Sequence, residues 1–356
     1  MRSPELDGVR GIAILLVVIF HYFSNPINVQ PGTVLAYVQH AGYLGWTGVD
    51  LFFVLSGYLI GGILMDNRGA TNYYSVFYLR RACRILPVYL LMVSLFYLLL
   101  VLDPGGLAGL YAGGTDLWHY VLFMQNYFVD EMGGYGPIML SVTWSLAIEE
   151  QFYIVIPILI RVVSPRVLLV IILIIFFVAP IARDYFSNMG SITYALSRGD
   201  SLMTGVIIAW VQRYKPEIFK NLKIGSVLML AVTSVMMLKL ATGWPKNGGV
   251  SEHLVFSVFY GSFLLTVLQF QGTIFTFPLR AWALQWLGRR SYAIYLFHMP
   301  LIFVLSRAYG RTPGIDSYSD FVLPLVVFGI CCVAAEFSYR AIERPFITRG
   351  GQHAYL

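Results

Sequence analysis

The sequence predicts an all-α, polytopic membrane protein, and three features of its composition lead to that fold class. Hydrophobic residues occupy 58% of the 356 positions, and the mean hydropathy is +0.71. Asp, Glu, Lys and Arg together occupy only 12%, whereas roughly a quarter is usual in a soluble globular domain. At about 20 apolar residues for each bilayer crossing, this composition suffices for roughly ten helical spans.

Ten apolar runs are predicted to cross the bilayer. In chain order they are Gly8 to Phe23, Val49 to Met65, Ile85 to Leu102, Val142 to Ile160, Val167 to Ala182, Ser201 to Gln212, Ile224 to Ala241, His253 to Phe270, Ser291 to Tyr309 and Phe321 to Tyr339. The polar stretches between them are too short for an extramembrane domain, and no strand alternation or internal repeat stands out. The prediction is a single integral-membrane domain over residues 1–356, with no soluble domain.

One further segment, Trp118 to Val129, is only twelve residues long and contains His119, Gln125 and Asn126. Arginine and lysine are enriched in short cytoplasmic loops. Ten spans with an inner N-terminus place 17 of the 24 Lys and Arg residues on the cytoplasmic side and six on the outer side. A full crossing by this segment would turn the basic clusters after Arg161 outward. It is therefore predicted as a re-entrant or interfacial helix, and both termini are predicted to be cytoplasmic.

The charge and the cysteines exclude two other classes of protein. The net charge of +6 comes from short basic clusters beside apolar runs, not from one polar face, so nucleic acid is not a predicted partner. Cys83, Cys331 and Cys332 have neither the spacing of a disulfide framework nor that of a metal site. No metal is predicted, and membrane lipid is the partner that the composition indicates.

Arg10 and His21 are the first ionisable residues within a predicted span, where such groups are costly and often functional. They are eleven residues apart, so an α-helix turns both to the same face, about 16 Å apart along its axis. Arg10 is predicted near the cytoplasmic end and His21 in the outer half. The alternatives are that Arg10 reaches lipid phosphates and that His21 caps an interfacial turn.

Arg80, Arg81 and Arg84 are predicted at the cytoplasmic start of the third span. Guanidinium groups at this spacing suit phosphate groups, although they also fit ordinary positive charge on the cytoplasmic side. Together with His21 they predict a path for a ligand that has phosphates at one end and a long thin arm.

Carboxylates and hydroxyls form a further group of candidates. Ser145, Glu149 and Tyr153 recur every four residues and predict one polar stripe on the fourth span. Asp50 opens the second span and could orient His21 or cap a helix. A structural ion pair with an arginine is the alternative for Glu149.

Three more ionisable residues complete the candidates. Arg198 and Asp200 stand at the outer entrance of the sixth span, where they could simply pair with each other. His298 is predicted near mid-membrane, two residues before Pro300, which frees backbone carbonyls, so a hydrogen-bonded structural histidine is the favoured interpretation.

These motifs, taken in order along almost the whole chain, resemble the acyltransferase 3 family of multipass membrane O-acyltransferases, which modify bacterial surface polysaccharides. The matching stretches are Leu6-Asp-Gly-Val-Arg-Gly-Ile-Ala13 through His21, Asp50 to Gly57, Arg81-x-x-Arg84, Ser145-Leu-x-x-Glu149-x-x-x-Tyr153, Arg198-x-Asp200 and Tyr339-Arg-Ala-Ile-Glu-Arg-Pro-Phe346. Each stretch is weak alone, but their order and spacing are specific.

The resemblance implies transfer of an acyl group, with acetyl favoured, from cytoplasmic acyl-CoA to a hydroxyl of a glycan or lipid-linked sugar outside a bacterial inner (plasma) membrane. It implies that His21 is the catalytic histidine, that Arg10 supports the donor path, and that Arg81 and Arg84 hold donor phosphates, with Arg80 beside them. Glu149 or Asp50 is predicted to set the tautomer of His21. The residues predicted to bind the acceptor are Ser145, Tyr153, Arg198, Asp200 and His298.

A proton-coupled secondary transporter or flippase of a glycoconjugate is the alternative, with His21, Glu149 and Asp200 relaying protons. The sequence has no evident inverted repeat or matching pair of broken helices. The oligomeric state is not predicted.

Overall fold

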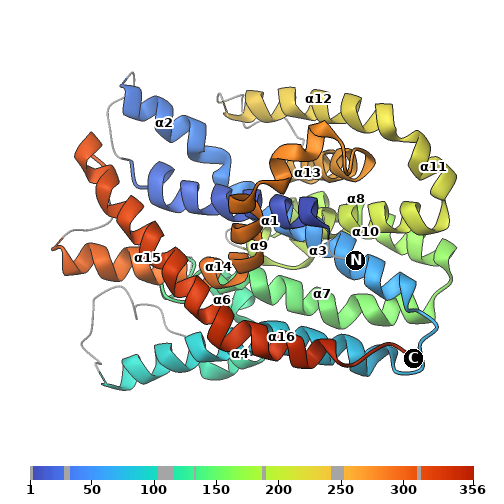
Figure 1. The fold of residues 1–356 in the computed structure, drawn as a ribbon, viewed down its shortest axis with the longest axis horizontal. Helices are drawn as coiled ribbons and strands as arrows, with labels where there is room; N and C mark the ends of the chain where they lie inside the picture. The colour runs from blue at the N-terminus through green and yellow to red at the C-terminus, as the bar shows by residue number, and fades with distance from the viewer. Residues whose placement is uncertain are drawn as a thin grey trace. The chain divides into compact units, whose positions relative to one another are not determined.

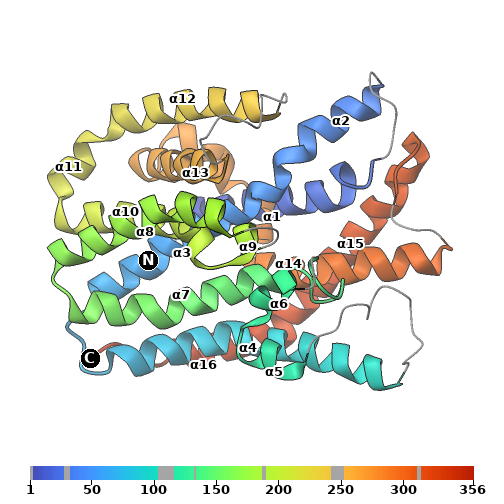
Figure 2. The same cartoon turned by 180° about the vertical axis from the view of Figure 1, so that it is seen from behind.

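The structure is a computed structural model that describes residues 3–27, 33–102, 116–131, 134–186, 190–241, 252–310 and 314–356. Throughout these ranges the regular elements are helices, and the one β contact is an isolated bridge between Ile27 and Ile315. Figures 1 and 2 follow the chain through them. The predicted all-α fold class is confirmed.

The helix bounds are as follows. The α-helices are α1 (Pro4–Ile19), α2 (Val34–Tyr43), α3 (Gly48–Asp66), α4 (Tyr73–Leu102), α5 (Leu117–Val121), α6 (Gln125–Glu131), α7 (Thr143–Val162), α8 (Pro165–Tyr185), α9 (Gly190–Thr193), α10 (Gly199–Tyr214), α11 (Pro216–Asn221), α12 (Lys223–Ala241), α13 (Glu252–Gln269), α14 (Trp282–Ala308), α15 (Val322–Ser338) and α16 (Arg344–Gly351). Two π-helical turns are η1 (Phe20–Ser24) and η6 (Tyr339–Glu343), and four 3₁₀ turns are η2 (Leu44–Thr47), η3 (Leu196–Arg198), η4 (Ile274–Arg280) and η5 (Tyr318–Phe321).

The chain is a multi-pass membrane protein. Among the described residues, eight helical segments are long and apolar enough to cross a bilayer: Pro4–Ser24, Val34–Asp66, Tyr73–Leu102, Pro165–Tyr185, Lys223–Ala241, Glu252–Gln269, Trp282–Ala308 and Tyr318–Gly351. The other two predicted runs coincide with α7, of 20 residues, and α10, of 16. The count of ten stays a prediction.

Two helices begin well before the apolar runs that are predicted to cross the bilayer. α4 begins at Tyr73, twelve residues before the predicted span, because Tyr73, Val76 and Phe77 bury their side chains and extend the helix. α14 begins at Trp282, nine residues before Ser291. In both cases arginines lie inside a continuous helix and lower the local hydropathy, so the apolar run is shorter than the helix.

The segment predicted as one re-entrant or interfacial helix is two short helices. α5 has five residues and α6 has seven, so at about 1.5 Å per residue neither can cross a bilayer. Phe123 separates them with a φ of 54°, a left-handed conformation that interrupts a right-handed helix. Gln125, at the start of α6, donates to the Tyr89 hydroxyl (3.2 Å) and to the Thr143 carbonyl (2.9 Å).

The chain divides into two compact units, each built from three separate segments. Unit 1 comprises Met1–Val17, Leu44–Arg68 and Ile148–Arg289, and unit 2 comprises Val18–Tyr43, Gly69–Ala147 and Arg290–Leu356. The predicted single domain over residues 1–356 stays a prediction.

Unit 1 has an apolar core to which the first part of α1 and helices α3, α10 and α13 contribute, and α12 lies along α13 (Figures 1 and 2). Helices α3 and α10 of this unit approach each other closely. A Cβ added to Gly57 would lie 2.0 Å from the Leu202 carbonyl oxygen, and one added to Gly205 would lie 2.0 Å from the Val54 carbonyl oxygen. Glycine at both positions lets the two backbones touch, as is common between membrane helices.

Gly205→Ala is therefore expected to lower the thermal unfolding midpoint in detergent, because the added methyl group forces α3 and α10 apart at a cost of about 1–3 kcal/mol. Gly225→Ala is the matched control, since a Cβ at Gly225 in α12 meets no heavy atom within 4 Å. The control is expected to leave the midpoint unchanged or to raise it, because alanine has the higher helix propensity. Equal midpoints for the two variants would contradict the close packing.

Candidate functional site

The predicted site residues divide between the two units. Unit 2 contains His21, Arg80, Arg81, Arg84, Ser145 and His298, and unit 1 contains Arg10, Asp50, Glu149, Tyr153, Arg198 and Asp200.

His21 lies in the π-helical turn η1, which follows α1 directly. The shared face predicted for Arg10 and His21 assumed a regular α-helix, and the π turn changes the angle at which His21 leaves that helix. π turns of this kind occur often at functional sites. His21 is partly buried, and its ring lies 5.1 Å from the ring of His298, centroid to centroid, in an edge-on arrangement of 60°.

His298 is fully buried in α14. Its Nδ1 lies 2.7 Å from the Tyr295 carbonyl oxygen, and the Tyr22 hydroxyl donates to the carbonyl of His298 itself at 2.6 Å. These contacts confirm that His298 is hydrogen-bonded. The bond from Tyr22 also joins η1 to α14, at the residue that follows His21 in the sequence.

Ser145 lies in the first turn of α7 and contacts the same part of α14. Its hydroxyl is 2.6 Å from the Tyr295 hydroxyl, and both hydroxyls lie within hydrogen-bond distance of the Val142 carbonyl, at 3.1 and 3.2 Å. Tyr295, a residue that the motif search did not select, therefore joins Ser145 to the turn that holds His298. Its position three residues before His298 was the available signal.

The arginine cluster lies within α4, seven to eleven residues after its first residue, Tyr73. Arg80 donates through Nε and Nη2 to the His353 carbonyl, at 3.0 and 2.5 Å, and its guanidinium lies 5.2 Å from the centre of the Tyr355 ring. Burial raises the pKa of the Tyr355 hydroxyl, and the positive charges of Arg80 and Arg81 offset part of that rise. Arg80 is thus engaged by the last residues of the chain, and Arg81 lies within electrostatic range of them.

A cavity of about 440 Å³ lies at this end of α4. Asn72, Ser75 and Leu79 line it from the helix and its approach, and His353 lines it from the C-terminal residues. The cavity is close to the arginine cluster, since His353 also accepts the hydrogen bonds of Arg80.

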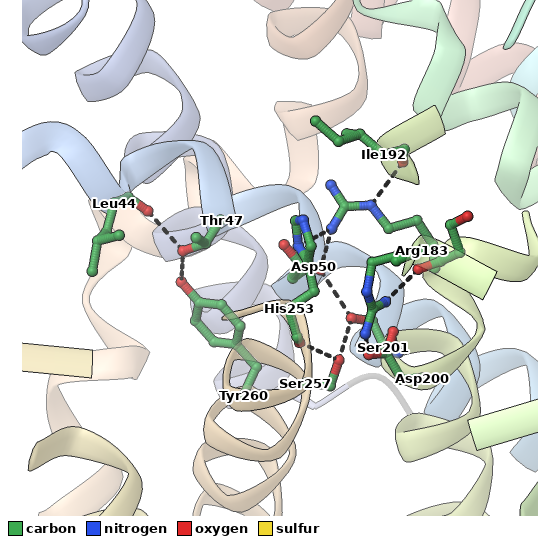
Figure 3. Close-up of polar contacts among 12 residues, drawn as sticks. Leu44, Thr47, Asp50, Arg183, Ile192, Asp200, Ser201, His253, Ser257 and Tyr260 are labelled. Carbon is green, nitrogen blue, oxygen red and sulfur yellow. Dashed lines mark hydrogen bonds and ion pairs between the residues drawn. The ribbon is translucent and has the colours of Figure 1, made fainter. Parts of the chain in front are cut away.

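Unit 1 contains a buried network of charged and polar side chains (Figure 3). Asp50, from the first turn of α3, is fully buried and pairs with Arg198, which is 1% exposed, at 3.1 Å. Arg198 also donates through Nε to the Ile192 carbonyl at 2.9 Å. Oδ1 of Asp50 accepts a second bond from Ser201 at 2.9 Å, and its Oδ2 has no hydrogen-bond partner among the described residues.

Arg198 and Asp200 are close in the sequence, but each forms its ion pair with a different residue. Asp200 pairs with Arg183 of α8 at 2.7 Å, while Arg198 pairs with Asp50, so the simple alternative of an Arg198–Asp200 pair is not the arrangement that these contacts give. Asp200 also accepts from the backbone amide of Ser201 at 2.9 Å. Two carboxylates and two guanidinium groups therefore balance inside one network.

His253, in the first turn of α13, was not selected from the sequence although it joins this network. Nη1 of Arg198 is hydrogen-bonded to Nδ1 of His253. Because a guanidinium group can only donate, Nδ1 is the accepting nitrogen of a neutral imidazole. Arg183 was overlooked as well. Both residues stand at the outer ends of predicted spans, and that position was the signal they shared with Asp50 and Arg198.

The stripe predicted on α7 is present. The Tyr153 hydroxyl donates to Oε2 of Glu149, one turn earlier, at 3.1 Å. It also lies 2.6 Å from the Ser56 hydroxyl of α3, which must donate because the single phenolic proton is used. In α1, Arg10 pairs with Asp7 at 3.1 Å.

The described residues contain no group of three or more His, Cys, Asp or Glu side chains that could hold a metal ion. The groups available for a ligand are imidazole, hydroxyl, carboxylate and guanidinium.

Comparison with known proteins identifies relatives for almost the whole chain. The family model described as an acyltransferase domain, acyltransferase 3, matches residues 3–338. The peptidoglycan O-acetyltransferase OatA of Listeria monocytogenes (serovar 1/2a, strain EGD-e) is 28% identical over 98% of this chain and 56% of its own length.

Two further relatives carry similar names. A candidate O-acetyltransferase of Staphylococcus aureus (strain COL) is 30% identical over 98% of this chain and 58% of its own length. A candidate peptidoglycan O-acetyltransferase of Bacillus subtilis (strain 168), YrhL, is 30% identical over 98% of this chain and 55% of its own length. The chain thus spans less than three fifths of the length of these relatives.

Proposed function

Because the chain belongs to the acyltransferase 3 family, we propose that it is a membrane O-acyltransferase. The donor is cytoplasmic acyl-CoA, with acetyl-CoA first, and the acceptor is a hydroxyl of a glycan or lipid-linked sugar outside the cell membrane. The names of the relatives, which describe O-acetyltransferases and peptidoglycan, support this choice of acyl group and acceptor.

One structural observation carries the proposal further than the family does. His21 of η1 and the three arginines of α4 belong to the same compact unit, although about 60 residues separate them in the sequence. An acyl-CoA molecule has its phosphates at one end and its thioester at the other. Its binding site therefore needs cationic groups for the phosphates and a catalytic group for the thioester, and one compact unit contains both.

In the proposed reaction, His21 is the general base. It takes the proton of the acceptor hydroxyl while the hydroxyl oxygen attacks the thioester carbonyl. The carbon–sulfur bond then breaks, and the CoA thiolate takes the proton from the imidazolium. The products are the ester and CoA, and the histidine returns to its neutral form.

Arg81 and Arg84, with Arg80 beside them, are proposed to bind the donor phosphates from the cytoplasmic side of a bacterial inner membrane. Both chain termini lie on that side in this proposal. Ser145 is proposed to contact the acceptor. Acceptor binding by Arg198 and Asp200, which lie in the buried network of unit 1, stays a prediction from the sequence.

The direct test uses purified protein in proteoliposomes with [¹⁴C-acetyl]-CoA and a soluble peptidoglycan fragment as acceptor. Label that moves to an ester on the fragment, and is released by mild base, supports the proposal. Entry of intact acceptor into the vesicles without ester formation supports the transporter alternative instead.

Arg81→Ala and Arg84→Ala are expected to raise the apparent KM for acetyl-CoA by about tenfold or more each, since a hydrogen bond to a charged group contributes about 1.5–3 kcal/mol. The kcat should change less, because the phosphates are remote from the thioester. Lys220→Ala is the control, as Lys220 is exposed on α11 and pairs only with exposed Glu217 among the described contacts. An unchanged KM in both arginine variants contradicts donor binding by this cluster.

A further inference from the structure

His298 presents a nitrogen whose state follows from its hydrogen bonds. A carbonyl oxygen can only accept, so Nδ1, at 2.7 Å from the Tyr295 carbonyl, carries the proton of the ring. A fully buried imidazolium would be costly at this depth, so the ring is neutral and Nε2 holds its lone pair.

Nε2 of His298 has no hydrogen-bond partner among the described residues. A buried polar atom without a hydrogen-bond partner is uncommon and requires an explanation, of which a catalytic role is one. The nearest imidazole is His21, with the ring centroids 5.1 Å apart and the planes at 60°. A small rotation of the rings at this separation brings a nitrogen of each within hydrogen-bond distance.

The surroundings of His298 hold its ring in place. The Tyr22 hydroxyl binds the His298 carbonyl at 2.6 Å, and Tyr295, which accepts from Nδ1, has its own hydroxyl 2.6 Å from that of Ser145. A residue fixed from three helical segments is suited to orient a neighbour, because little side-chain freedom remains to be lost when the hydrogen bond forms.

We propose that His298 is the positioning residue for His21: Nε2 of His298 accepts the N–H of His21 and leaves the other nitrogen of His21 unprotonated toward the acceptor hydroxyl. The inference rests on the proposed function, in which His21 is the base. When His21 takes the acceptor proton, its N–H to His298 persists, and the imidazolium charge is shared along that bond. In this proposal the neutral imidazole of His298 sets the tautomer of His21, a role that was predicted from the sequence for Glu149 or Asp50.

Two conservative substitutions separate this role from a structural one. His298→Gln places an amide oxygen near the position of Nε2 and so keeps an acceptor for His21. His298→Asn places an amide N–H near the position of Nδ1 and so keeps the bond to Tyr295 but removes the acceptor. A positioning role predicts that Asn lowers kcat about tenfold or more with an unchanged KM for acetyl-CoA, while Gln retains most of the wild-type kcat. A purely structural role predicts the opposite order, and that order, or two unaffected variants, overturns the proposal.

A second measurement does not depend on acyl transfer. In ¹⁵N-histidine-labelled wild-type protein, a hydrogen bond between the two rings gives a through-bond ¹⁵N–¹⁵N coupling between His21 and His298, assigned by its loss in His21→Ala. Detection of the coupling supports the pair, and its absence overturns it. If His21→Ala retains full transfer activity while the coupling is present, the catalytic base of the proposed function fails and the histidine pair stands.

Discussion

His21→Ala is expected to lower kcat for transfer from acetyl-CoA to a glycan hydroxyl by about 10² to 10⁴, which is the usual contribution of a general base. His298, whose ring lies 5.1 Å from that of His21, is fully buried, so we do not expect it to replace His21 as the base. Initial rates with labelled donor in proteoliposomes measure the effect. Thermal shift with CoA should show that donor binding survives.

His40→Ala is the matched control for this loss. His40 lies on the exposed side of α2 in the same unit and contacts only the Ala36 carbonyl of its own helix among the described contacts, at 2.7 Å. It is expected to keep the wild-type rate. If a correctly inserted His21→Ala protein transfers acetyl at a rate near that of His40→Ala, His21 is not the base.

The fold class could be predicted because it depends on a sum over the whole chain, and the excess of apolar residues is too large for local errors to change it. Local features of the backbone were harder to predict from the sequence. The left-handed backbone at Phe123, which divides the predicted interfacial helix into α5 and α6, is a conformation that few non-glycine residues adopt. The π turn at His21 was also not predictable, since a five-residue change in helical winding leaves no periodic pattern.

The same distinction applies to the site. The Tyr153–Glu149 bond follows from spacing within one helix, and the sequence predicted that stripe. The Asp50–Arg198 pair joins residues 148 positions apart, and His253 joins it from a third element. Such contacts depend on how α3, η3 and α13 pack, which the periodicity of one helix cannot indicate.

Asp50→Ala is expected to lower the free energy of unfolding by about 3–5 kcal/mol, because it leaves the guanidinium of Arg198 buried without its carboxylate. The side chains of the pair are 0% and 1% exposed. Asp66→Ala is the control. It removes the carboxylate of a pair with Arg213 whose contacts, 2.6 and 2.7 Å, are shorter than that of the Asp50 pair. The Asp66 side chain is 53% exposed, however, so its loss should cost about 1 kcal/mol or less. Reversible unfolding in SDS measures both, and equal losses contradict the burial of the Asp50 pair.

A double variant separates stability from function in this network. Asp50→Leu with Arg198→Met removes both charges and keeps the volume, so it should be more stable than Asp50→Leu alone, because no unpaired guanidinium remains. If the double variant regains stability but its KM for the glycan acceptor rises, Arg198 also binds the acceptor, as the sequence predicted. If stability and KM both match the wild type, the charges of this pair serve only to join α3 to η3, and Arg198 does not bind the acceptor.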